Sequence, residues 1–103
     1  MAKLGLPFRP YHPGELLKEE LECRHVKQKE FAYKFSISYT ALNEVLNGKR
    51  PVSTDFALLM EAALGVSADL LVRMQTSYNM QIARNDKKLT ERFNEIRKIA
   101  SML

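Results

Sequence analysis

The sequence predicts an all-α protein, and three observations support this fold class. Apolar residues recur three and four positions apart in successive segments, which is the spacing of one face of a helix. Capping residues such as Ser, Asp or Pro precede these segments, and Gly follows two of them, as is usual at helix ends. No run resembles a strand. A chain of 103 residues has the length of one domain with one modest core.

An extended arm is predicted over residues 1–12, because Pro7 and Pro10 interrupt any helical pattern there. Pro13 is suited to the first position of a helix, and Glu15 is favourable near the positive end of the helix dipole. Carboxylates stand opposite the apolar stripe of this first helix. The stripe consists of Leu16, Leu17 and Leu21.

A second helix is predicted from Lys27 to about Phe35. The next residues interrupt it, because Ser36 and Ser38 favour turns and caps over helix interiors. We expect Ser38 to cap a third helix that ends near Asn47, since a Gly directly follows that residue. The two helices are therefore joined by a short turn.

Two longer helices are predicted next. The first begins at Ser53 or Thr54 and ends at Gly65, and the second is capped by Ser67 and continues to about Ile82. Both carry an apolar stripe that is expected to face the core. The expected core residues are Phe56, Leu59, Met60, Ala63 and Leu64, followed by Leu70, Leu71, Met74 and Tyr78.

The last helix is predicted over residues 85–103. Its apolar residues are spaced four, three, four and three apart, which is the pattern of a helix that packs against a partner helix. We therefore expect a dimer or partner contact through this stripe. The alternative is that the segment folds back on its own core or frays. The residues that we assign to the contact are Leu89, Phe93, Ile96 and Ala100.

Few residues in the chain have the potential for catalysis. A single cysteine, Cys23, excludes an intramolecular disulfide, and we expect it to pack at the end of the first helix. His12 is expected to shape the start of that helix, and His25 to be exposed in the following loop. There is no Ser/His/Asp arrangement, phosphate-binding Gly-rich loop or metal-ligand spacing. The sequence therefore predicts no enzyme, no cofactor, no metal and no small-molecule substrate.

Charge is distributed unevenly along the chain. The formal net charge is +4 and the isoelectric point is about 9.3, which favours anionic partners. Between positions 24 and 50, six basic residues stand against two acidic ones. Between positions 15 and 22, four glutamates stand against one lysine; the simplest interpretation is a solvated face, and the alternative is a contact with a basic protein.

The predicted third helix has two distinct faces. Ala41, Leu42, Val45 and Leu46 fall on one side, while hydroxyl and amide side chains fall on the other. Amides and hydroxyls can read base edges in the major groove, and a helix set after a short turn on another helix has the form of a helix-turn-helix. The alternative is an ordinary solvated helix face. The predicted base-reading residues are Ser38, Tyr39, Thr40, Asn43 and Asn47, and the predicted phosphate-binding residues are Lys27, Gln28, Lys29, Lys34, Lys49 and Arg50.

The segment QKEFAYKFSISYTALNEVLNGKRPVS resembles the helix-turn-helix of the lambda-repressor-like, or XRE-type, family. Ala32 matches the small residue of its second helix, and Ile37 and Val45 match its apolar anchors. Ser36 departs from the pattern, because the family usually has Gly in the turn. The segment HPGELLKEEL and the sequence after the motif are similar to HigA-type antitoxins, so that the resemblance covers residues 11–82. The chain departs from these antitoxins in lacking Trp near Leu70 and in its tail.

The resemblance implies a lambda-repressor-like five-helix bundle over residues 13–84, followed by a C-terminal helix over residues 85–103. It implies a homodimer that binds operator DNA, represses its own operon and neutralises a HigB-like toxin that cleaves mRNA. Two alternatives remain: a phage-type repressor without a toxin, and a protein-interaction module with little affinity for DNA. The chain lacks a signal-peptide pattern and an apolar run of about 18 residues, so we expect a cytoplasmic protein without a membrane contact.

Overall fold

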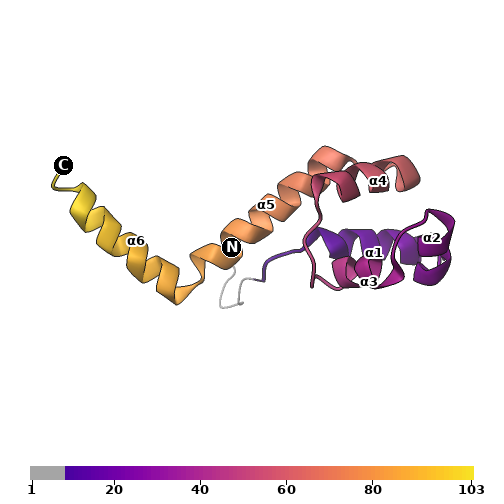
Figure 1. Ribbon diagram of the computed structural model, residues 1–103, viewed down its shortest axis with the longest axis horizontal. Coiled ribbons are helices and arrows are strands. Elements are labelled where there is room, and N and C mark those ends of the chain that lie inside the picture. Colours follow the sequence, from indigo (N-terminus) through magenta and orange to yellow (C-terminus); the bar gives the residue numbers. More distant parts are fainter. Residues whose placement is uncertain (1–8) are drawn as a thin grey trace.

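The computed structural model describes residues 9–103, and this part of the chain is entirely helical apart from its connections (Figure 1). The predicted all-α fold class is therefore confirmed. Most of the arm predicted over residues 1–12 lies outside the described residues. The helices are α1 (Pro13–Cys23), α2 (Gln28–Lys34), α3 (Tyr39–Leu46), α4 (Thr54–Leu64), α5 (Ala68–Arg84) and α6 (Lys87–Ala100).

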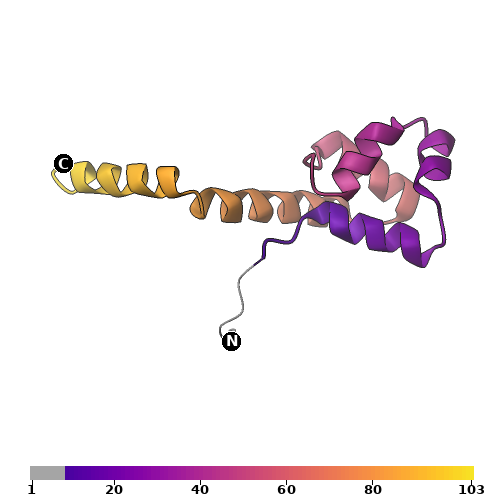
Figure 2. The same cartoon turned by 90° about the horizontal axis from the view of Figure 1, so that it is seen from below.

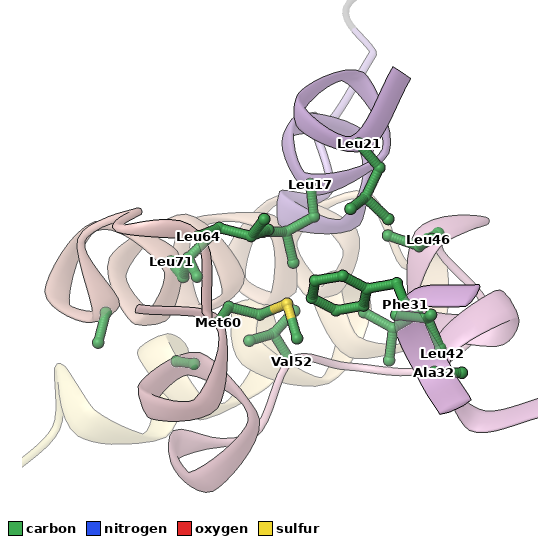
Figure 3. Packing of buried hydrophobic residues seen from close by; sticks show 13 residues of the cluster. Leu17, Leu21, Phe31, Ala32, Leu42, Leu46, Val52, Met60, Leu64 and Leu71 are labelled. Carbon is green, nitrogen blue, oxygen red and sulfur yellow. The ribbon is translucent and has the colours of Figure 1, made fainter. Parts of the chain in front are cut away.

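Helices α1 to α5 form a bundle around one apolar core (Figure 3). Within it α2 packs on α3, α4 packs on α5, and α1 contacts both α3 and α5. Leu17 of α1, Leu42 of α3 and Met60 of α4 are completely buried. The other buried apolar residues are Leu21, Phe31, Ala32, Val45, Leu46, Val52, Ala57, Leu64, Ala68 and Leu71.

The predicted capping residues begin the helices as expected. The Oγ atoms of Ser38, Ser53 and Ser67 each accept a hydrogen bond from a backbone N–H in the first turn of the helix that follows, over 3.1–3.2 Å. Gly65 ends α4 with φ of 76°, a left-handed conformation that Gly adopts without steric cost. These local signals explain why most predicted boundaries agree with the structure to within one or two residues.

The start of α1 is fixed by close packing as well as by a cap. His12 is 3% exposed, and its Nδ1 accepts a hydrogen bond from the backbone N–H of Gly14 over 2.9 Å. This confirms that His12 shapes the helix start. A Cβ atom on Gly14 would lie 1.8 Å from the carbonyl oxygen of Val45 in α3. Helices α1 and α3 can therefore meet at this distance only because residue 14 has no side chain.

Helix α6 extends away from the bundle (Figures 1 and 2). The radius of gyration is 17.7 Å, whereas a compact domain of 100 residues has about 13 Å. Among the helices, α6 packs mainly on α5, and none of its residues is buried. Asp86 caps its start, because Oδ1 accepts from the backbone N–H of Lys88 over 2.9 Å. The alternative in which this segment folds back on the core is therefore wrong.

Two packing expectations are also wrong. Leu70 is 39% exposed, because the buried side of α5 carries Ala68, Leu71 and Gln75 instead. Gln75 replaces an apolar residue there, since its Oε1 accepts a hydrogen bond from the backbone N–H of Val52 over 2.8 Å. Cys23 is exposed rather than packed. Phe35 is 40% exposed and rests on the ring of Phe31 at a centroid distance of 4.8 Å.

Candidate nucleic-acid interface

The turn between α2 and α3 is tight and contains one strained residue. The backbone N–H of Ile37 donates to the carbonyl of Ala32 over 2.8 Å, which closes the end of α2. Ser36 has φ of 56°, in the left-handed region that favours Gly. The sequence position that departs from the family pattern is therefore also the position where a side chain is strained.

Replacing Ser36 by Gly is expected to raise the free energy of unfolding by about 0.5–1 kcal/mol, because Gly adopts a positive φ without steric cost. Chemical denaturation measures this change. Ser36→Ala is the matched control, since it removes the same hydroxyl but keeps the strained backbone. A stabilisation by both substitutions would show that the hydroxyl, and not φ, is responsible.

The predicted reading face is organised by a chain of amide hydrogen bonds. Asn43 Nδ2 donates to Oε1 of Gln28 over 3.0 Å, which joins α3 to the start of α2. Asn47 Nδ2 donates to Oδ1 of Asn43 over 3.2 Å. Lys18 Nζ, from α1, donates to Oδ1 of Asn47 over 3.4 Å. Four side chains from three helices therefore form one continuous polar surface.

The other predicted base-reading residues lie at the start of α3. The Oγ of Ser38 accepts from the backbone N–H of Ala41, so this hydroxyl is engaged as a helix cap. Thr40 is exposed, and Tyr39 is 42% exposed. The ammonium group of Lys29 lies 5.6 Å from the centroid of the Tyr39 ring, a cation–π arrangement. The start of α3 thus presents a hydroxyl and an aromatic ring next to a cation.

Glu44 is a residue of this face that sequence reasoning missed. It follows Thr40 by four positions, so both project from the same side of α3. Its Oε1 accepts hydrogen bonds from Nε and an Nη atom of Arg50 over 3.0 and 2.7 Å. The predicted phosphate-binding Arg50 is therefore engaged with a carboxylate that partly neutralises it. The helical spacing from Thr40 is the sequence signal that could have identified Glu44.

The predicted phosphate-binding residues fall into separate groups. Lys27, Gln28 and Lys29 line one hollow together with Tyr39 and Asn43. Lys49 is exposed just after α3, beside the Glu44–Arg50 pair. Lys34 is not brought to this hollow and lines a different one near the end of α4. Sequence reasoning also missed Lys18, which reaches this face from the acidic helix α1.

The predicted contact residues of α6 form an exposed stripe. Phe93 and Ile96 are 44% and 45% exposed, and Leu89 and Ala100 are exposed on the same helix. The stripe belongs to no core within residues 9–103. Because α6 extends away from the bundle, the stripe stands apart from the polar surface of α3 (Figures 1 and 2).

Two further properties concern metals and membranes. Among the residues that the structure describes, no group of three or more His, Cys, Asp or Glu side chains is placed to hold a metal ion. Within the same part of the chain, no helix has both the length and the apolar character needed to cross a membrane.

Comparisons with known proteins agree with this geometry. The helix-turn-helix family model matches residues 17–71, more than half of the chain. Virulence-associated protein I of Dichelobacter nodosus is 32% identical over 78 residues, which cover 75% of this chain and 72% of that protein.

Two solved structures are similar along most of their length. A HigA-family addiction module antidote protein from Coxiella burnetii has a TM-score of 0.73 and 28% identity, over 85% of this chain and 95% of that chain. The Pseudomonas aeruginosa antitoxin HigA, solved with the higBA promoter, has a TM-score of 0.69 and 27% identity, over 74% and 84% of the two chains. The resemblance to XRE-type proteins and HigA-type antitoxins is thereby confirmed, and the chain belongs to the helix-turn-helix family.

Proposed function

We propose that this protein is a dimeric, sequence-specific DNA-binding antitoxin of the cytoplasm. In this role it binds its own operator, represses its operon and neutralises a HigB-like toxin that cleaves mRNA. The observation that carries the proposal is the surface formed by Lys18, Gln28, Asn43 and Asn47, which orients two amides on the outward side of α3.

This surface suits base reading in the major groove. Asn amides can form two hydrogen bonds with adenine, Thr can offer a hydroxyl or a methyl group, and a carboxylate such as that of Glu44 can accept from cytosine. Because Gln28 and Lys18 hold Asn43 and Asn47 in place, these amides lose little freedom when DNA binds. The network therefore favours a helix that reads DNA over an ordinary solvated face.

Cations on both sides of α3 suit the DNA backbone. Lys27 and Lys29 stand at the start of α2, and Lys49 and Arg50 follow α3. Each phosphate that is neutralised releases counterions, so affinity should fall steeply with salt. Such contacts fix the orientation of the protein while α3 supplies the sequence preference.

The exposed stripe of α6 supports a dimer. An apolar stripe with a/d spacing is buried most simply by the same stripe of a second copy. In a parallel pair, Arg92 would lie opposite Arg97 of the partner subunit, and these like charges repel. The charge pattern therefore favours an antiparallel pair. A dimer of this family would place its two α3 helices roughly 34 Å apart on DNA.

The toxin partner is supported by the similarity to HigA antitoxins and by the acidic face of α1. Arg9 pairs with Glu15 over 2.7 Å, Tyr11 donates to Glu19 over 2.9 Å and Arg24 pairs with Glu20 over 3.0 Å, which leaves Glu22 as an exposed carboxylate on α1. A basic ribonuclease would find complementary charge on this face.

Co-expression with the neighbouring gene, followed by pull-down and footprinting on the shared promoter, tests the proposal. We expect the neighbouring product to co-purify and the promoter to be protected. A footprint without relief of any growth defect would support a phage-type repressor instead. Tight binding of a small basic protein without a footprint would support an interaction module.

Variants of α3 and of the loop after it should act differently. Thr40→Ala and Asn43→Ala are expected to lose about 1–3 kcal/mol of discrimination at individual base pairs. Lys49→Ala should weaken all DNA sequences about equally and reduce the salt dependence. Arg50→Ala should weaken binding more than Lys49→Ala, because it also frees the Glu44 carboxylate. Titrations with operator and scrambled DNA measure both quantities, and an equal loss of specificity in the two classes would contradict the assignment.

A further inference from the structure

We propose that His12 positions the loop of residues 47–50 for contact with DNA, and that it does so with a neutral imidazole ring. The inference deepens the proposed DNA-binding function and rests on it. His12 lies outside the reading face, at the start of α1, so its contribution would be made through the backbone of the loop.

The imidazole of His12 connects three parts of the bundle. Its Nδ1 accepts from the backbone N–H of Gly14 at the start of α1, over 2.9 Å. The Tyr78 ring of α5 meets it edge-on, with centroids 4.8 Å apart and an interplanar angle of 79°. A Cβ atom on Gly48 would lie 3.6 Å from its Cγ, so the ring rests against the backbone of the loop. The ring is therefore packed between α1, α5 and the loop that follows α3.

The loop that the ring supports carries two predicted phosphate-binding cations. Gly48 has φ of 74°, and its N–H donates to the carbonyl of Val45 over 3.0 Å. The N–H of Lys49 donates to the carbonyl of Glu44 over 2.8 Å. The directions in which Lys49 and Arg50 leave the bundle are thus set by a backbone that rests on His12.

This arrangement requires the neutral ring. Since Nδ1 accepts a hydrogen bond, the neutral imidazole carries its proton on Nε2. Protonation of Nδ1 would remove the acceptor and direct two donors, the ring N–H and the Gly14 N–H, at each other. Burial lowers the pKa of His12, and although Glu15 and the backbone of Arg50 raise it, it stays below its usual value. The charged or titratable groups around the ring are Arg9, Glu15, Lys18, Glu19 and Glu22, with Tyr78 from α5 and Lys49 and Arg50 from the loop.

The sign of the pH effect follows from this lowered pKa. The folded protein holds a proton on His12 less readily than the unfolded chain does. The contribution of the neutral His12 ring to the free energy of unfolding is therefore complete above the ordinary pKa of His and declines as pH falls below it. Operator affinity depends on the ring in the folded protein, so in the wild type it should fall only at pH values below the ordinary pKa of His, where this ring gains its proton.

His12→Asn tests the inference. The Asn oxygen can still cap α1 through Gly14, but the shorter side chain cannot rest against Gly48 as the imidazole does. We expect faster amide hydrogen exchange at Gly48 and Lys49, an operator affinity lowered by about tenfold, and loss of the pH-dependent part of binding. His25→Asn is the matched control, because it removes the other histidine, which is exposed, and should leave all three quantities unchanged.

Tyr78→Leu provides a second variant that leaves the cap intact. It removes the ring that holds the imidazole from the side of α5, so smaller changes in the same direction are expected. The inference is overturned if His12→Asn binds operator with the wild-type affinity and pH profile. Should His12→Asn not fold, the same result with Tyr78→Leu overturns it. If the wild-type protein binds no operator, the proposed function fails. The positioning role is excluded separately if amide hydrogen exchange at Gly48 and Lys49 is unchanged in His12→Asn.

Discussion

Replacing Gly14 by Ala is expected to lower the free energy of unfolding by about 3 kcal/mol. The added Cβ would lie 1.8 Å from the carbonyl oxygen of Val45 and 2.8 Å from its carbon, both of which are backbone atoms that cannot rotate away. Helix propensity alone would favour Ala by up to about 1 kcal/mol, so a net loss must come from this clash. Thermal unfolding should show the melting temperature reduced by roughly 12–24 °C.

Gly65→Ala is the matched control for Gly14→Ala. Gly65 has φ of 76°, but no atom lies within 4 Å of an added Cβ, so only backbone strain of about 1 kcal/mol is expected. If Gly14→Ala is as stable as Gly65→Ala, α1 and α3 can move apart without a loss of free energy, and the prediction is wrong. Because α3 is the proposed reading helix, the Gly14 variant should also lose operator binding at temperatures where it remains folded.

Deletion of residues 86–103 is expected to give a monomer whose affinity for the full operator is lower by on the order of a hundredfold or more. Two linked reading helices bind their half-sites together, whereas a monomer must bind each one separately. Affinity for a single half-site should be unchanged, because α1 to α5 retain their own core. Light scattering measures the oligomeric state, and titration with full and half operators measures the two affinities. An unchanged dimer would place the interface on α5.

A pair of point variants separates loss of the stripe from loss of the helix. Phe93→Lys places a charge within the apolar stripe, whereas Asn94→Lys places the same charge beside it on an exposed position. We expect the first to dissociate the dimer and the second to leave it intact. Dissociation by both would indicate general charge repulsion.

Local features of the fold could be predicted from the sequence. Ser38, Ser53 and Ser67 act through hydrogen bonds within one helical turn, so each reveals its helix start without knowledge of the rest of the fold. The apolar spacing of α3 likewise separated its buried from its outward residues. Ser36 was recognised as unusual through the resemblance, because the family usually has Gly at this position of the turn, and its φ of 56° lies in the region that Gly adopts without strain.

Features that depend on contacts between distant segments could not be predicted. Leu70 looked like a core residue, but the buried side of α5 is decided by Gln75, which satisfies the backbone of Val52. The engagement of Arg50 by Glu44 depends on how the chain turns after Gly48. Lys18 belongs to an acidic segment, and only the packing of α1 on α3 brings it to Asn47.

If α6 pairs two subunits as proposed, this exposed helix would also link the lifetime of the protein to its abundance. An isolated helix of this length is only marginally stable in water, and none of the side chains of α6 is buried. In a lone subunit the segment would therefore unfold often and offer proteases an open chain, whereas a partner subunit covering the stripe would shield it. Scarce copies would then be degraded faster than plentiful ones, so that turnover itself responds to concentration.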